Sequence, residues 1–96
     1  MNRFELSATL IEKSVKRFTP AGVPVLECQV QHDSDVTEAA SVRRLNFETR
    51  VKAVGETAER LQGIALGSRC RLTGFLAPAR LQSKQLIFHI TDFELE

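Results

Sequence analysis

Alternating polar and apolar residues predict an antiparallel hairpin over residues 68–95, around which the rest of the chain is arranged. Residues 69–76 alternate with the period of two that a half-buried strand shows. Residues 86–90 are β-branched and aromatic, as strands are. The segment between them carries Arg80 and Lys84 and no acidic residue. The pattern therefore predicts two strands that hold out a basic loop.

Three further segments alternate in the same way and predict strands over residues 3–13, 26–32 and 42–54. A turn at residues 19–24 separates the first two strands, because two prolines on either side of a glycine interrupt a strand ladder. Residues 33–41 are polar and small, and we expect an exposed, mobile loop there.

A short helix is predicted between the third strand and the hairpin, with Thr57 as its N-cap and Gly63 as its stop. Five strands with one short helix between the third and fourth predict an all-β fold, the OB-fold, a five-stranded Greek-key barrel that spans residues 1–96 as one domain. OB-folds bind oligonucleotides on strands two and three with the help of two loops. A small barrel without a ligand is the alternative that the pattern leaves open.

The composition is that of a globular domain, with 43% hydrophobic and 26% charged residues. A net charge of +1 argues against a strongly basic nucleic-acid binder, but acids and bases cluster separately along the chain, which allows one positive face. No apolar run approaches the ~18 residues of a membrane span, and no signal peptide is visible. We therefore expect a cytoplasmic protein without a membrane partner.

The sequence offers no catalytic or metal-binding constellation. Cys28 and Cys70 lie on apolar faces of predicted strands, so we expect reduced core residues. Two cysteines without a nearby histidine pair make a poor zinc site. No paired carboxylates, nucleophile elbow or phosphate-cradling glycine loop is present. The sequence therefore predicts no enzyme, no cofactor and no metal, and it predicts structural or dimer-surface roles for His32 and His89.

The chain has six phenylalanines and neither tryptophan nor tyrosine. We expect core positions for four of them, Phe18, Phe75, Phe88 and Phe93. Another phenylalanine, Phe47, lies on the same face of its predicted strand as the apolar Leu45 and Val51, which favours a position for its ring in the core. A bulge in the strand would instead turn it outward, toward a ligand. The sequence pattern leaves both readings open.

Several stretches together resemble the primosomal replication protein N (PriB) family, a relative of the single-stranded DNA-binding protein (SSB). These stretches run nearly end to end through residues 2–9, 19–24, 30–32 and 66–76, with Arg44, Phe47, Ser83, Lys84 and His89. The resemblance implies a homodimeric OB-fold that binds single-stranded DNA and acts in replication restart beside the helicase PriA, the loader DnaT and SSB. It also implies an aromatic at Phe47 on the DNA face, where stacking contributes ~1–3 kcal/mol per base.

The candidate DNA-binding residues are cations of the two loops together with Phe47 and its neighbours. They are Lys16 and Arg17 in the first loop, Arg44, Phe47 and Arg50 on the third strand, and Arg80 and Lys84 in the last loop. Cations of this kind contact phosphates without sequence preference, and solvated surface charges are the alternative. By analogy with related OB dimers, Arg3 and the first strand are the candidate dimer seam.

Two departures from the family pattern are expected to weaken DNA binding. Asp33 stands where the family has a cation, and the basic loop holds only two cations. The leading hypothesis is a single-stranded DNA-binding accessory protein that bridges DNA and PriA. The alternatives are an RNA-binding or SSB-like coat protein, and a protein-interaction adaptor with weak nucleic-acid contact.

Overall fold

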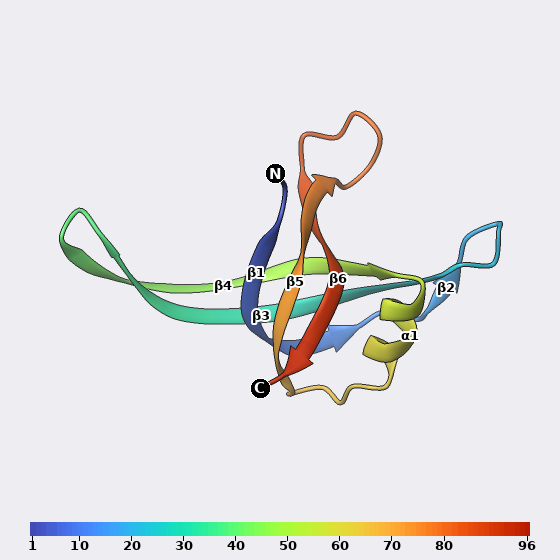
Figure 1. The fold of residues 1–96 in the computed structure, drawn as a ribbon, viewed down its shortest axis with the longest axis horizontal. Coiled ribbons are helices and arrows are strands. Elements are labelled where there is room, and N and C mark those ends of the chain that lie inside the picture. The colour runs from blue at the N-terminus through green and yellow to red at the C-terminus, as the bar shows by residue number, and fades with distance from the viewer.

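The computed structural model describes residues 1–96 and contains six strands and one helix (Figure 1). In chain order these are β1 (Phe4–Lys13), β2 (Arg17–Phe18), β3 (Pro24–Glu38), β4 (Ser41–Val54), α1 (Glu56–Gln62), β5 (Arg69–Pro78) and β6 (Leu86–Leu95). The strands form one sheet in the order β1-β5-β6-β4-β3-β2, and β1 also pairs with β3. This second pairing closes a barrel of five strands, to which the two-residue β2 is added. The predicted OB-fold is confirmed.

Strand β1 closes the barrel by changing partner along its length. Its first half, from Phe4 to Thr9, pairs with β5, and its second half, from Thr9 to Lys13, pairs with β3. The register shifts between Leu10 and Glu12, as at a β-bulge, which bends a strand and increases its twist. All pairings are antiparallel except that of β4 with β6.

The core lies inside the barrel and is closed on one side by α1. Val51 and Ala53 of β4 are completely buried, as are Leu26 of β3 and Ala58 of the helix. Cys28 and Cys70 are free and buried in the same cluster, which confirms that they are reduced core residues. Burial raises the pKa of the Cys28 thiol to about 11, although the nearby Lys13 ammonium opposes the shift. Each thiol therefore stays protonated at neutral pH, because burial also raises the pKa of Cys70.

The predicted loop at residues 33–41 is wrong, because β3 and β4 continue past the barrel as a two-stranded arm. Glu38 pairs with Ser41, so the turn consists only of Ala39 and Ala40, whose φ angles are 51° and 63°. Positive φ at both turn residues matches the twist of a hairpin and usually selects Gly or Asn. We call residues 33–46 the β3–β4 arm; it projects to the left in Figure 1. Ion pairs between its strands, such as Arg43 with Glu38, stabilise it.

Two smaller predictions also need correction. The N-cap of α1 is Gly55, whereas the Thr57 hydroxyl donates a hydrogen bond to the Thr91 carbonyl over 3.2 Å. The stop at Gly63 is confirmed. Phe88 and Phe93 are buried as predicted and Phe75 is half-buried. Phe18 is 59% exposed because β2 lies outside the barrel.

Gly74 lets β5 approach β6 unusually closely. A Cβ atom at this position would lie 1.7 Å from the carbonyl oxygen of His89. The β5–β6 register shifts between Thr73 and Gly74, so the glycine lies at an irregularity of the ladder. Only a residue without a side chain fits there. Elsewhere, α1 has seven residues, and no helix is long and apolar enough to cross a membrane.

Candidate nucleic-acid interface

Phe47 lies on the inward side of β4 but beyond the end of the barrel. It has the same parity as the buried Val51 and Ala53, yet it is 40% exposed. Its register partner on β3 is His32, and the two ring centroids are 5.0 Å apart with a 37° angle between the planes. The core reading of Phe47 is therefore wrong. The residue forms an open aromatic surface at the root of the β3–β4 arm.

His32 is held in place by hydrogen bonds at both ring nitrogens. Its Nδ1 donates to the carbonyl oxygen of Ser7 over 2.6 Å, since a carbonyl can only accept. Its Nε2 then accepts from the Ser34 hydroxyl over 2.8 Å in the neutral tautomer. The imidazole is thus fixed between β1 and the arm. It supports one side of the Phe47 ring.

Most cations of the chain are paired with carboxylates. Of the 13 lysines and arginines, eight lie within 4.0 Å of an acidic group. Acids and bases are separate along the sequence, but the strand register brings them together in pairs. These pairs offset much of the charge that is clustered along the sequence, so any positive face must come from the cations that have no carboxylate partner. The cations without a carboxylate partner are the ones available to bind an anionic ligand.

Three of the predicted site cations are among the paired ones. The Lys16 ammonium lies 2.9 Å from Glu59 of α1 and 5.5 Å from the centroid of the Phe18 ring. Arg17 donates to Glu27 over 2.8 Å, and this hydrogen bond is the main reason that the pKa of the Glu27 carboxyl falls below its usual range.

Arg44 contacts two carboxylates of the opposite strand of the arm. Its guanidinium lies 3.4 Å from Asp35 and 3.8 Å from Asp33. Asp33 also accepts a hydrogen bond of 2.7 Å from the Asn46 amide. Asp35, and at a longer distance Asp33, thus offset the charge of Arg44.

Five cations have no carboxylate partner, and four of them make no side-chain hydrogen bond. Lys13 donates to the carbonyl oxygens of Gln62 and Ile64 behind α1, which leaves Arg50, Lys52, Arg80 and Lys84. Arg50 and Lys52 lie on the outer side of β4, on either side of the buried Val51. Three of these four residues are predicted site residues.

Arg80 and Lys84 lie in the β5–β6 loop, which projects at the top of Figure 1. The loop is closed at its base by a backbone hydrogen bond of 2.8 Å from Ala79 to Gln85. Both cations are exposed, and Leu81 between them is 95% exposed. The prediction of two strands that hold out a basic loop is confirmed.

Lys52 belongs to a row of three side chains that the sequence reasoning missed. Lys52 pairs in register with His89 across β4 and β6, and His89 pairs with Phe75 across β6 and β5. The His89 and Phe75 rings stack, with centroids 4.8 Å apart and planes 14° apart. The core position predicted for Phe75 is wrong, because its ring lies on the outer side of the sheet against His89. The parallel pairing of β4 with β6 brings Lys52 next to these two rings.

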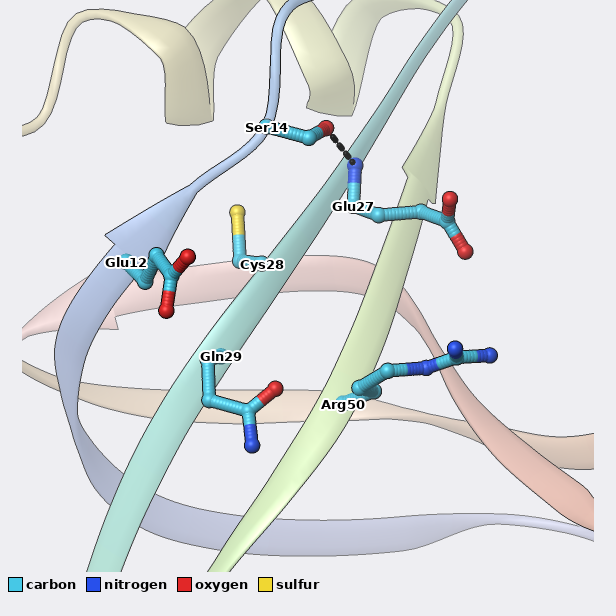
Figure 2. A pocket seen from close by; sticks show the side chains of 6 residues that line it. All are labelled: Glu12, Ser14, Glu27, Cys28, Gln29 and Arg50. Atoms are coloured by element: carbon cyan, nitrogen blue, oxygen red, sulfur yellow. Dashed lines mark hydrogen bonds between the residues drawn. The ribbon is translucent and has the colours of Figure 1, made fainter.

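A shallow hollow of about 220 Å³ lies on the outer side of β3, next to the bulge in β1 (Figure 2). A hydrogen bond of 3.2 Å from the Glu27 amide to the Ser14 hydroxyl crosses its rim. Two carboxylates lie beside the single guanidinium, so the hollow is a poor phosphate site. Its lining residues are Glu12, Ser14, Glu27, Cys28, Gln29 and Arg50.

The predicted dimer residue Arg3 lies just before β1. Its guanidinium is exposed and lies 3.8 Å from the Glu5 carboxylate. Both residues line a second hollow of about 350 Å³ with Thr73 and Thr91 of the neighbouring strands. No group of three or more His, Cys, Asp or Glu side chains could hold a metal ion.

Known proteins resemble this chain in sequence along almost all of its length. A family model described as another single-strand binding protein family matches residues 2–92. The replication restart protein PriB of Bordetella pertussis is 41% identical over 90 residues, which cover 94% of this chain and 84% of the relative. PriB of Nitrosomonas europaea is 37% identical over 91 residues, with 95% and 84% covered. The chain belongs to the PriB family.

Solved structures agree with this assignment to the PriB family. The structure of PriB from Ralstonia solanacearum superposes with a TM-score of 0.90 at 36% identity and covers 100% of this chain and 98% of that one. The single-stranded DNA-binding protein from Thermus aquaticus gives a TM-score of 0.78 at 18% identity, with 100% and 50% covered. The second likeness shows the shared fold alone. The PriB resemblance read from the sequence motifs is thus confirmed.

Proposed function

We propose that this PriB-family chain is a single-stranded DNA-binding accessory protein of replication restart, and that it bridges DNA and the helicase PriA. The match to PriB replication restart proteins along almost the whole chain carries the proposal. The open aromatic at Phe47 and the free cations supply the two elements that single-strand binding needs, a stacking platform and a positive track.

Phe47 stacks on a base in this proposal, while Arg50, Arg80 and Lys84 contact phosphates. Arg80 and Lys84 have no competing carboxylate, so a phosphate meets them without displacing another acid. Arg50 forms no ion pair, but Glu12 and Glu27 line the same hollow, so its contact is expected to be the weakest of the three. The contacts are made to the backbone and to the face of a base, which all sequences share. Binding is therefore expected to depend little on sequence and strongly on salt.

Lys16, Arg17 and Arg44 join the interface only after a phosphate displaces their carboxylates. Exposed ion pairs contribute about 0–1 kcal/mol, so the exchange is feasible. Because an acid is released for each phosphate bound, each of these cations adds less affinity than a free one.

Partner contacts and dimerisation belong to the same proposal. Over Phe4–Leu6, before the Ser7 carbonyl that His32 occupies, β1 pairs only with β5, so its other edge is open there to a second copy of β1, with Arg3 at the seam. PriA, DnaT and SSB are the expected protein partners from the family resemblance. Sedimentation of wild type and an Arg3→Glu variant tests the seam, and the variant is expected to shift the equilibrium toward monomer.

The first experiment is an anisotropy titration of a labelled oligothymidine of about 35 nucleotides at several salt concentrations. The three phosphate contacts of Arg50, Arg80 and Lys84 predict that log affinity falls against log salt with a slope of roughly −2, from about −0.7 per contact. An oligouridine of the same length tests for an RNA-binding protein, and a strongly sigmoidal titration would indicate an SSB-like coat. No binding at low salt would reject the single-strand proposal.

The second candidate function is a protein-interaction adaptor with weak nucleic-acid contact. It is favoured by the pairing of most cations and by the net charge of +1. PriA added to the labelled oligonucleotide with and without the chain separates the two functions. A bridging protein raises the amount of PriA on DNA, whereas an adaptor binds PriA equally well in the absence of DNA.

A further inference from the structure

We infer that Lys52, His89 and Phe75 form a second contact site for single-stranded DNA, in which a base extends the stack of the two rings and Lys52 contacts the adjoining phosphate. The inference rests on the proposed function, but it names a site on the other side of the sheet from Phe47. It involves β4, β5 and β6, whereas Phe47 and His32 lie on β3 and β4.

The three side chains point out of the barrel from neighbouring strands. Lys52 lies between Val51 and Ala53, both 0% exposed, and His89 lies between the buried Phe88 and Ile90. Because successive strand residues point to opposite faces, Lys52 and His89 face outward. Phe75 is the register partner of His89 and stacks on it at 4.8 Å. All three are only partly buried, so a ligand can reach them.

The charges of the row suit a nucleotide. Lys52 forms no ion pair within 4.0 Å and no side-chain hydrogen bond, because Glu27, its register partner on β3, is paired with Arg17 instead. Burial and the nearby Lys52 ammonium lower the pKa of His89, so its ring is neutral at physiological pH and presents an uncharged aromatic surface. A neutral ring pair beside an uncommitted cation combines the stacking surface and phosphate contact on which single-strand binders rely.

The position of the row connects the other free cations. Arg50 precedes Lys52 by two residues on the same outer side of β4. From Phe75, β5 continues through Pro78 into the loop that carries Arg80 and Lys84. A single DNA strand that contacts Arg50 and the β5–β6 loop therefore crosses the Lys52, His89 and Phe75 row between them. Without the row, the two groups of free cations would be separated by the width of β6 and β5.

The chain contains no tryptophan and no tyrosine, so a single introduced tryptophan reports without background. In Phe75→Trp, unlabelled oligothymidine is expected to quench the fluorescence with the same midpoint as the anisotropy titration. Leu66→Trp is the control, because Leu66 is 56% exposed in the connection between α1 and β5, away from the row. Its fluorescence is expected to change little.

Two further variants test the row without relying on the reporter. Phe75→Leu is expected to weaken binding at least about fivefold through lost stacking. Lys52→Gln is expected to make the salt slope shallower by about 0.7, the value of one phosphate contact. Arg71→Gln is the matched control, since Arg71 lies on β5 but is already paired with Glu94. Circular dichroism of each variant is the check that its fold is kept.

The outcomes separate this inference from the proposed function. If wild type binds but Phe75→Trp is not quenched and Lys52→Gln keeps the wild-type slope, the row is a structural ring pair and the inference is overturned. The inference is also overturned if Phe75→Leu binds DNA more weakly only because it is unfolded, and Lys52→Gln keeps the salt slope of the wild type. If wild type itself does not bind oligothymidine, both the inference and the proposed function fail.

Discussion

His32 and Phe47 face each other across the β3–β4 ladder just where the barrel ends and the arm begins. The imidazole is fixed by Ser7 and Ser34, so the phenyl ring has a rigid support on one side and solvent on the other. A ring held in this way loses little conformational freedom when a base stacks on it. The pair thus explains how a residue on the inward side of β4 can present an aromatic ring at the surface.

We predict that Phe47→Leu weakens oligothymidine binding by a factor that corresponds to about 1–3 kcal/mol, the value of one stacked base. The free energy of unfolding should change little, because the ring is 40% exposed. Phe18→Leu is the control, since Phe18 is exposed on β2 at the opposite end of the molecule from the arm (Figure 1). Equal losses in both variants would contradict a specific role for Phe47.

We predict that Arg80→Gln combined with Lys84→Gln makes the salt dependence of binding shallower by about 1.4 in slope, from two lost phosphate contacts. Lys16→Gln combined with Arg17→Gln removes the same charge but should change the slope less, because Glu59 and Glu27 already neutralise these cations. Anisotropy titrations at several salt concentrations give both slopes. A larger change of slope in the Lys16 and Arg17 double variant would contradict the proposal that the unpaired cations of the β5–β6 loop contribute more to DNA binding.

We predict that Gly74→Ala lowers the free energy of unfolding by at least about 1–3 kcal/mol, the range for overpacking. The new methyl group would collide with the His89 carbonyl, a backbone atom that cannot move aside without breaking the β5–β6 ladder. Urea denaturation measures the change. Gly22→Ala controls for the loss of glycine, since a Cβ there meets no atom within 4 Å although its φ of 83° is also unfavourable.

We predict that neither cysteine reacts with a thiol reagent at pH 8 while the protein is folded. Burial raises the pKa of Cys28 to about 11, so its reactive thiolate is scarce, and only 4% of the residue is exposed. Both thiols should react rapidly after addition of urea. Fast reaction of one thiol in the native protein would show that a strand of the barrel opens locally.

Much of the barrel can be predicted from alternation, because a strand with one buried face must repeat with a period of two. The first and third predicted strands agree with β1 and β4 to within a residue. The β3–β4 arm could not be predicted in this way, since it has no buried face and turns on Ala39 and Ala40 without a glycine or asparagine. The backbone ladder and exposed ion pairs across its strands hold it together, and these ion pairs can be identified only once the register is known.

The candidate site was predictable in type but not in arrangement. A basic loop can be read from the sequence because Arg80 and Lys84 stand in a segment without acids. The neutralisation of Arg44 by Asp35, nine residues away in sequence, requires the hairpin register. The alternation gives the side of the sheet on which Phe47 lies, but not the point at which the barrel ends.

The strand at the end of the sequence, β6, lies between β4 and β5 in the sheet. Without β6, β5 is linked to β4 only the long way round, through β1 and β3. The other strands can therefore pair in this order, but the barrel stays open between β5 and β4 until β6 is inserted. Insertion of β6 joins residues far apart in sequence, such as Val51 of β4 with Phe88, and non-local pairing of this kind makes folding slow.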